Sequence, residues 1–310
     1  MSTNIDMRDA FFDQVYEEAK ADRGVIFLAA DHTAFALEKY KKDLPDQFIN
    51  MGISEQNMIS VAAGLALKGK KVFAYGIANF ASLRCLEQIN VDLSEMDLPV
   101  NIVITGSGFT YSTDGPTHHG IQDVAAMQAI PNMSIFNCSD HVNSARFAKI
   151  ATEEKGPKYF RLEKGFLPTL HHKDSDFTSG LERIKDGDDI AIISTGFMTH
   201  KCVELAKNLK RYSINAGIID VYRIKPLNVK KLEKELSATK KVVIVEENIL
   251  TGGLGSSVIS LLSDVGFTRP TLRLSISDQH CIKYGDREWL HQQYGLDVST
   301  MENKILEWLG

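Results

Sequence analysis

The sequence predicts an α/β protein built from two open, mostly parallel sheets. Short, continuously apolar runs of strand length alternate with segments of helical periodicity along the whole chain. Uniformly apolar strands separated by helices are typical of parallel sheets that helices cover on both faces. The length of 310 residues indicates two domains, because a domain usually has roughly 100–200 residues.

The first half of the chain opens with a predicted helix at residues 8–22, where apolar side chains recur at helical spacing. Apolar runs then predict the strands of one sheet, and the segments between them predict helices. Strands are expected at residues 25–30, 72–76, 100–105, 134–138 and 158–162. Helices are expected from Glu55, from about Phe80 to Leu93, and from near Asp140.

A polar break divides the chain into two predicted domains. The polar run at 171–176 and the turn cluster at 185–189 place the boundary between about 168 and 182. We therefore predict domains at residues 1–168 and 182–310, joined by a linker at 169–181.

The second domain repeats the alternation of strands and helices. Its strands are expected at residues 190–194, 216–221, 242–246 and 271–275. Ser299 and Glu302 fit a capping box at the start of the last helix. The glycine-rich turn at 252–257 lacks the dinucleotide-binding spacing and the P-loop lysine, so close packing is its expected role.

Composition limits the classes of function. Hydrophobic residues make up 44% and charged residues 24%, which is typical of soluble globular domains. The net charge of −5 without a basic block gives no footprint for nucleic acid or for an anionic membrane. No signal-peptide pattern or membrane-length apolar run occurs, so we expect a cytoplasmic protein. The four scattered cysteines predict reduced, structural thiols and no metal site.

Glu55 is the first candidate for chemistry. It opens a helix that continues into the small, apolar run at residues 59–67, and a carboxylate there lies near the positive end of the helix dipole. The alternative is that Glu55 only decorates the first turn while Asn50 or Ser54 caps the helix. The local pattern alone favours that alternative.

Other polar residues follow the predicted strands of the first domain. Ligands of open parallel sheets bind beyond the carboxyl ends of the strands. The residues expected there are Asp31, His32, Asp114, His118, His119 and Arg161. Several of them meeting Glu55 at one rim would form a candidate site. The adjacent histidines are also a weak metal pattern, or part of a solvated loop, and no third ligand lies near them.

Four motifs together resemble the transketolase family in their order and spacing. They are Gly52-Ile53-Ser54-Glu55-Gln56-Asn57-Met58, Ala78-Asn79-Phe80, Asp114-Gly115-Pro116-Thr117-His118 and Phe160-Arg161. This half resembles the pyrimidine-binding domain of transketolases and deoxyxylulose-phosphate synthases. Residues from about 181 onward resemble the C-terminal domain of the same thiamine diphosphate enzymes. The Gly-Asp-Gly…Asn motif, which in that family holds diphosphate and magnesium in a separate domain, does not occur in this sequence.

The resemblance implies that this chain supplies half of an active site. The other half, with the diphosphate and Mg²⁺, would belong to an N-terminal transketolase subunit, with thiamine diphosphate bound between the chains of an α₂β₂ heterotetramer. Glu55 would hydrogen-bond N1′ of the pyrimidine and take part in proton transfer. Phe80 would stack on the pyrimidine, and Asp31 would be a second polar residue on the cofactor side.

The resemblance also implies residues that bind the substrate. Asp114 and His118 match residues that bind and deprotonate hydroxyls of the donor sugar. Arg161 and Arg8 match arginines that contact a substrate phosphate, a task suited to guanidinium groups. Many transketolases have a phosphate-contacting histidine where this chain has Gly106, so the phosphorylation of its substrates stays open. His32 is the candidate to compensate.

The predicted activity is transfer of a two-carbon ketol unit from a ketose, or a ketose phosphate, to an aldose, in a complex with the partner chain. Two alternatives share the fold, namely a deoxyxylulose-phosphate-synthase-like condensation and the beta subunit of a 2-oxo acid dehydrogenase. The Asp-Gly-Pro-Thr-His loop argues against the latter. A non-catalytic regulatory partner is an alternative of another class, against which Glu55, Phe80 and His118 argue.

Overall fold

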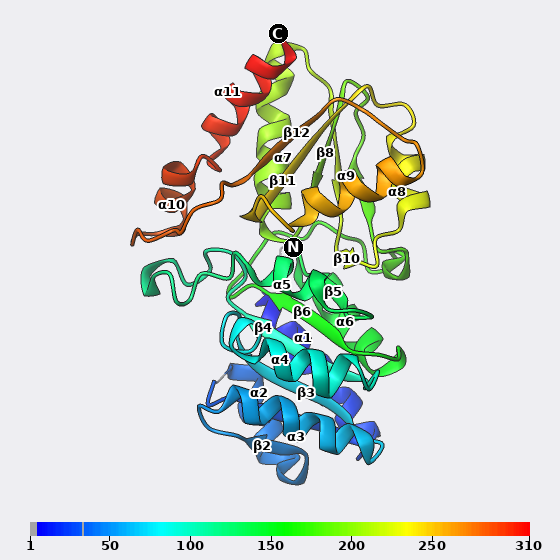
Figure 1. Ribbon diagram of the computed structural model, residues 1–310, viewed down its shortest axis with the longest axis vertical. Helices are drawn as coiled ribbons and strands as arrows, with labels where there is room; N and C mark the ends of the chain where they lie inside the picture. The colour runs from blue at the N-terminus through cyan, green and yellow to red at the C-terminus, as the bar shows by residue number, and fades with distance from the viewer. Residues whose placement is uncertain (1–4, 33) are drawn as a thin grey trace.

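Two open sheets form the framework of the molecule, one above the other in Figure 1. The structure is a computed structural model that describes residues 5–32 and 34–310, so Thr33 and the first four residues of the predicted first domain lie outside it. The strands of the first sheet are β1 (Val25–Ala29), β2 (Phe48–Asn50), β3 (Lys71–Ile77), β4 (Val100–Thr105), β5 (Ser134–Asn137), β6 (Lys158–Leu162) and β10 (Arg223–Lys225). Those of the second sheet are β7 (Glu182–Lys185), β8 (Ile190–Ser194), β9 (Ala216–Asp220), β11 (Lys241–Ile249) and β12 (Thr271–Ile276).

Both sheets are mostly parallel, which confirms the predicted fold class. The strand orders are β10-β5-β6-β4-β3-β1-β2 and β12-β11-β8-β9-β7. Each sheet has one antiparallel edge strand, β10 beside β5 and β7 beside β9. The interior strands β1, β4 and β8 are buried along their whole length, and the sequences of β1 and β8 are nearly continuous apolar runs.

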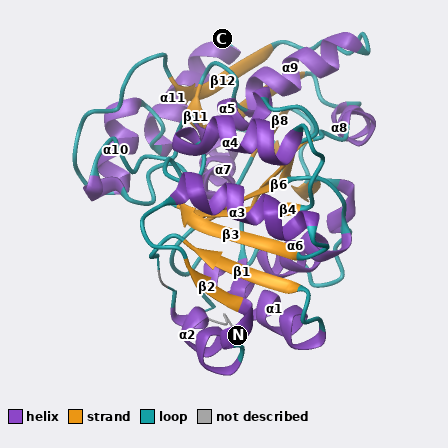
Figure 2. Ribbon diagram, turned by 60° about the horizontal axis from the view of Figure 1, so that its bottom comes forward, coloured by secondary structure: helices purple, strands orange, loops and turns teal. Residues whose placement is uncertain are grey.

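Helices cover both faces of each sheet (Figure 2). In the first domain, α1 (Met7–Ala21), α2 (Phe35–Asp43) and α6 (His141–Glu153) pack on one face. On the other face lie α3 (Glu55–Leu67), α4 (Leu86–Gln88), the π-helical turn η3 (Ile89–Ser94) and α5 (Asp123–Ala129). In the second domain, α7 (Phe197–Leu209), α10 (Arg287–Tyr294) and α11 (Val298–Leu309) oppose α8 (Val229–Leu236) and α9 (Leu254–Asp264).

One apolar core continues from the first domain into the second. It joins the inner face of α3 in the first domain to the α8 and α9 face of the second sheet, for example through Met58, Ile219 and Leu232. None of the helices in the described ranges combines the length and apolar character needed to cross a bilayer. All four cysteines are buried, free thiols, as predicted.

All nine predicted strands are confirmed, and each end lies within three residues of its predicted position. The helices α2, α5 and α10 and the strands β2, β7 and β10 were not predicted. The predicted helix from Phe80 to Leu93 is wrong in its first turn, because residues 78–82 form turns. A 3₁₀ turn η2 (Leu83–Cys85) then leads into α4 and η3.

Of the predicted helix starts near Asp140 and at Ser299, the structure confirms the first. Asp140 caps α6 with a complete capping box, which confirms the predicted start. The predicted box at Ser299 is wrong, because Asp297 caps α11 by accepting a hydrogen bond of 3.0 Å from the amide of Thr300. The helix therefore begins at Val298.

The glycine-rich turn before α9 is closely packed, as expected. The two carboxylate oxygens of Glu246 accept hydrogen bonds of 2.7 and 2.8 Å from the amides of Leu254 and Gly255. A Cβ at Gly253 would lie 2.2 Å from Oε2 of Glu246. The turn therefore encloses a carboxylate of this chain itself, at the place where other proteins bind phosphate.

A buried histidine holds the segment between the two sheets. Nδ1 of His171 lies 2.6 Å from Glu182 and Nε2 lies 2.8 Å from Asp220. Burial by itself lowers the pKa of His171, but the hydrogen bonds and charges of Asp220, Asp140 and Glu182 outweigh it and raise the pKa to about 9. The protonated ring therefore bridges the linker and the second sheet.

We predict that this histidine makes stability depend on pH. Its pKa is higher in the folded chain than the usual 6.5, so the stabilisation is fully present below pH 6.5 and is lost as the pH rises through 9. Wild type is expected to lose roughly 3 kcal/mol of unfolding free energy over this range, and His171→Gln much less. Urea unfolding at pH 6.5 and 9 measures both. The control is His172→Gln, at the exposed neighbouring position, which should behave like wild type. An equal change of unfolding free energy with pH in all three proteins would contradict the role of His171.

Candidate active site

The carboxyl ends of β1, β3 and β4 meet at one rim of the first sheet, because these neighbouring strands are parallel. Asp31 and His32 follow β1, and Phe80 lies in the turn after β3. The loop at 106–120 follows β4 and carries Asp114 and His118. Helix α3 begins at the same rim with Glu55.

Glu55 is the first residue of α3 and is only 4% exposed. Its Oε2 accepts a hydrogen bond of 2.8 Å from Nη1 of Arg84. The alternative in which Asn50 or Ser54 caps the helix is wrong, since no side chain caps α3 and the Ser54 hydroxyl donates to the carbonyl of Met51 at 2.6 Å. The carboxylate therefore stands at the positive end of the helix with one cation beside it.

A continuous chain of contacts leads from Glu55 along the rim. The guanidinium carbon of Arg84 lies 4.3 Å from the centre of the half-buried Phe80 ring. The Phe80 ring meets the His118 ring edge-on, with 5.0 Å between centroids. The His118 ring in turn lies 6.2 Å from the Tyr111 ring. The structure thus brings three of the predicted residues, Glu55, Phe80 and His118, into one row.

His32 closes the row at its far end. Its Nε2 lies 3.2 Å from the hydroxyl of Tyr111, and its ring packs on Tyr75 with 5.1 Å between centroids. Burial lowers the pKa of His32 to about 4, and the charges of Arg8, Lys164 and His118 add to this effect. At neutral pH His32 is therefore uncharged and acts only through hydrogen bonds.

Tyr111 explains the glycine at position 106. A Cβ at Gly106 would lie 2.7 Å from Cδ2 of Tyr111, and the backbone φ of +106° is unfavourable for other residues. The tyrosine ring therefore takes the space into which a larger side chain at this position would project. Its hydroxyl lies 3.2 Å from Nε2 of His32.

The loop after β4 is fixed on the side of Phe80. Nδ2 of Asn79 donates to the carbonyls of Thr117 at 3.1 Å and His119 at 3.0 Å. Asp114 is exposed, whereas His119 is turned inward, is 1% exposed and contacts the carbonyl of Ser112 at 3.2 Å. The two adjacent histidines therefore point to different environments, and residues 5–32 and 34–310 contain no cluster of potential metal ligands.

Asp31 and Arg8 lie beside the row rather than in it. Asp31 has a left-handed backbone with φ of +50°, and its Oδ1 accepts a hydrogen bond of 3.1 Å from Asn50. Arg8 is 8% exposed, with its Nε 3.6 Å from Asp9. Arg8 contacts the side chain of Tyr75, on which the His32 ring packs, and its charge contributes to the lowered pKa of His32.

Arg161 has a different environment from the one that we predicted. It is 2% exposed, and its guanidinium donates to both oxygens of Asp123, at 2.8 and 3.2 Å. It also donates to the carbonyl of Gly120 at 2.9 Å and to the side chain of Asn248 at 3.1 Å. We therefore leave Arg161 out of the rim site, because these contacts occupy most of its donors.

The loop is also tied to the second domain by a buried guanidinium. Arg287 of α10 donates to Glu163 at 2.8 and 3.1 Å and to Glu247 at 2.9 Å. Glu163 in turn accepts hydrogen bonds from the hydroxyls of Ser107 and, at 2.6 Å, Thr110. These contacts fix the base of the loop that carries Asp114 and His118.

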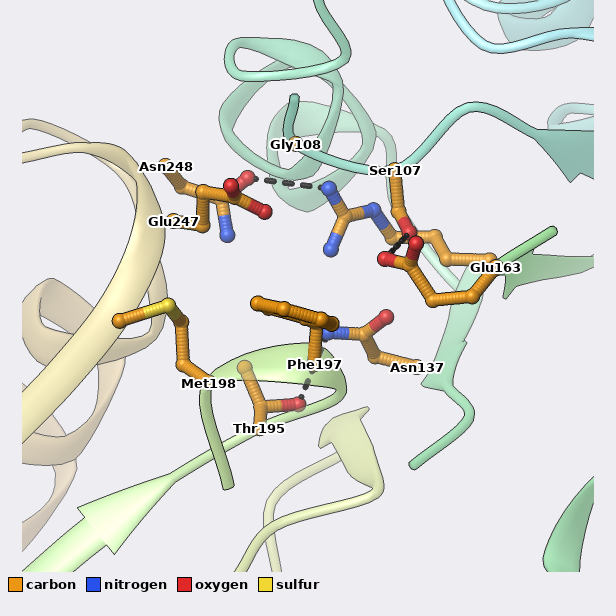
Figure 3. A pocket seen from close by; sticks show the side chains of 10 residues that line it. Ser107, Gly108, Asn137, Glu163, Thr195, Phe197, Met198, Glu247 and Asn248 are labelled. Atoms are coloured by element: carbon orange, nitrogen blue, oxygen red, sulfur yellow. Dashed lines mark hydrogen bonds between the residues drawn. The ribbon is translucent and has the colours of Figure 1, made fainter. Parts of the chain in front are cut away.

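Figure 3 shows the small cavity beside this network, between the two domains. Its lining includes Ser107 and Glu163 from the first domain and Phe197 and Glu247 from the second. The cavity measures about 10 Å³, which is about one water molecule. Neither a cofactor nor a sugar fits in a cavity of this size.

Sequence reasoning did not single out Arg84 or Tyr111, and it named Asn79 only as part of a motif, without a role. Each acts through a contact with a residue from another segment, and such contacts leave no local pattern. The only available signal was that Arg84 follows Phe80 by four positions in the sequence. The helix predicted there did not show that the Arg84 side chain faces Glu55 and Phe80.

The chain matches two family descriptions, "Transketolase, pyrimidine binding domain" over residues 3–169 and "Transketolase, C-terminal domain" over residues 180–301. Among curated relatives, a subunit of the apulose-4-phosphate transketolase of Phocaeicola vulgatus is 31% identical over 97% of both chains. A putative transketolase C-terminal section of Methanocaldococcus jannaschii is 32% identical, over 97% of this chain and 95% of that protein. The chain therefore belongs to the transketolase family.

Other relatives extend the comparison. A 1-deoxy-D-xylulose-5-phosphate synthase of Caldanaerobacter subterraneus is 31% identical over 96% of this chain, which spans 48% of that protein. The solved structure "Split gene transketolase, inactive beta4 tetramer" matches with a TM-score of 0.87 and 31% identity over 98% of both chains. This chain has the two domains of a transketolase beta subunit.

We predict that Arg161 and Asp123 act as one structural unit. Arg161→Met is expected to lower the unfolding free energy by about 3–5 kcal/mol, because it leaves the charge of Asp123 buried and unpaired. A second change, Asp123→Leu, should recover part of that loss in the double variant. Urea unfolding of the single and double variants gives the coupling. Additive effects of the two changes would contradict a paired structural role.

Proposed function

We propose that this chain is the pyrimidine-binding subunit of a two-chain transketolase, which transfers a two-carbon ketol unit from a ketose to an aldose. The observation that carries the proposal is the row formed by Glu55, Phe80 and His118. These residues come from three separate segments, and no structural need of the fold requires an acid, an aromatic ring and a histidine together at a half-exposed rim.

The residues at the rim fit the aminopyrimidine of thiamine diphosphate. A flat, nitrogen-rich group already lies between Glu55 and Phe80, since the guanidinium of Arg84 is hydrogen-bonded to the acid and stands over the ring. The same two residues would bind an aminopyrimidine through one hydrogen bond and one stacked face. When bound, thiamine diphosphate supplies the nucleophilic carbon for the carbonyl of the donor sugar.

Each residue of the row then has a task. Glu55 would hydrogen-bond the pyrimidine nitrogen N1′ and hold or release the proton there. Phe80 would fix the plane of the pyrimidine, and Asp31 would be a polar neighbour on the cofactor side. His118 would move a proton at a hydroxyl of the donor sugar, and Asp114 would bind a hydroxyl beside it.

We propose that the substrate carries an anionic group at the His32 end of the site. The buried Arg8 has an Nε atom without a hydrogen-bond partner, and the charges of Arg8 and Lys164 both contribute to the lowered pKa of His32. His32 and Tyr111 would add neutral hydrogen bonds. Two relatives have names that refer to charged sugars, an apulose phosphate and 6-deoxy-6-sulfo-D-fructose. A phosphate or sulfo group is therefore the expected anionic group.

The diphosphate and Mg²⁺ would be held by an N-terminal transketolase subunit, in an α₂β₂ heterotetramer. The names of two relatives support a partner chain, since one is called a transketolase subunit and the other a transketolase C-terminal section. The outer side of α3 is exposed at Ser60 and Gly64, and apolar Ile53 and Leu86 beside the row are 78% and 38% exposed. Such a surface suits burial against a partner.

The test is reconstitution from purified chains. This chain, the N-terminal subunit from the same organism, thiamine diphosphate and Mg²⁺ are mixed with a ketose phosphate and an aldose. We expect a new ketose by chromatography only when both chains are present. Carbon dioxide release from pyruvate plus an aldehyde would support the synthase-like condensation instead, which the relative from Caldanaerobacter subterraneus favours. Turnover by this chain alone would contradict a shared site.

We predict that Glu55→Gln lowers kcat of the reconstituted enzyme at least about 100-fold, because an amide cannot exchange the proton that the role requires. Assembly with the partner, measured by analytical ultracentrifugation, should be unchanged. Glu204→Gln, at an exposed position on α7, is the matched control and should keep full activity. An active Glu55→Gln enzyme would remove Glu55 from the chemistry.

A further inference from the structure

One side chain already makes both contacts that the proposed function assigns to the pyrimidine. Arg84 donates a hydrogen bond of 2.8 Å to Glu55, and its guanidinium carbon lies 4.3 Å from the centre of the Phe80 ring. The His118 ring also packs edge-on against the Phe80 ring, with 5.0 Å between the two centroids. A second flat group cannot occupy the same place between the acid and the ring.

From this competition we propose that Arg84 is a latch, a residue that holds the pyrimidine site closed in the unassembled subunit and leaves it when the cofactor binds. The inference rests on the proposed function, since it concerns the same site. It goes further in naming the residue that sets the affinity for the cofactor.

The Arg84 side chain is partly exposed and can change its rotamer, whereas Glu55 is fixed by burial. The side chain of Arg84 is 43% exposed, but that of Glu55 is 4% exposed and fixed at the start of α3. A groove of about 570 Å³ opens beside the latch and is lined by Gln56, Leu86 and Glu87 as well as Arg84. Glu87 stands three positions further along the chain, so it offers the displaced guanidinium a second carboxylate.

The latch also protects the free subunit. Without Arg84, the carboxylate of Glu55 would be buried without a cation, which is costly for a folded chain. With Arg84 in place the acid is paired until the cofactor arrives. The apparent dissociation constant of the cofactor is then the intrinsic constant divided by the fraction of subunits in which the site is open. It therefore rises as more subunits are closed.

Binding of thiamine diphosphate to the reconstituted complex tests the latch. Isothermal titration with Mg²⁺ present should give a dissociation constant roughly fivefold lower for Arg84→Ala and for Arg84→Met than for wild type. Arg84→Met keeps the bulk of the side chain but removes its charge. Arg84→Lys keeps the ion pair but not the flat stacking, so an intermediate value is expected. Arg211→Ala, at an exposed position outside the site, is the control and should bind like wild type.

A second measurement on the free chain does not depend on activity. Arg84→Met should lower the Tm, because it leaves Glu55 unpaired, and the same change in a Glu55→Gln background should lower it less. The difference between the two shifts measures the coupling of the latch to the acid.

The outcomes separate the two proposals. If wild-type complex binds thiamine diphosphate but Arg84→Ala and Arg84→Met bind it equally well or more weakly, the latch is wrong and the proposed function stands. Absence of coupling in the Tm experiment also overturns the latch. If the wild-type complex does not bind thiamine diphosphate at all, the proposed function itself fails.

Discussion

The position of the site loop depends on one buried guanidinium. Arg287 lies between Glu163 of the first domain and Glu247 of the second, and Glu163 also binds the base of the loop that carries His118. Burial by itself raises the pKa of Glu247, but the charges of Arg287 and His291 lower it to about 2, so the carboxylate stays ionised. Loss of any member of such a buried set leaves a charge without a partner. The second domain therefore holds the rim of the first in place.

Three polar side chains of the site have partners within the chain. Glu55 is paired with Arg84, His32 with Tyr111, and Asp31 with Asn50. Each pair joins two segments that are distant in sequence, so the rim is ordered before any ligand arrives. Binding of a cofactor and a sugar would then exchange internal partners for external ones rather than create order. An exchange of this kind would let the rim stay folded without a ligand.

The sequence predicted the framework because burial on both faces makes strands visible as apolar runs, as in β1 and β8. It also predicted Glu55, Phe80 and His118 as site residues, although only the combined resemblance separated them from ordinary cap, core and loop residues, and the structure places them near one another. The edge strands β7 and β10 were not predicted, because half-buried strands such as Glu182–Lys185 do not contain an apolar run. The environment of Arg161 could not be predicted for another reason. The sequence shows a cation at a strand end, whereas the pairing with Asp123 exists only in three dimensions.

Strand β10 makes the first sheet depend on a late part of the chain. It belongs to the second half of the chain, yet it pairs antiparallel with β5 and closes one edge of the first sheet. During translation the earlier strands emerge first, and the outer edge of β5 stays unpaired until Lys225 has left the ribosome. Open edges of this kind readily pair with other chains. The first domain is therefore completed by the second during biosynthesis, and the period before that is when a nascent chain is most exposed to aggregation.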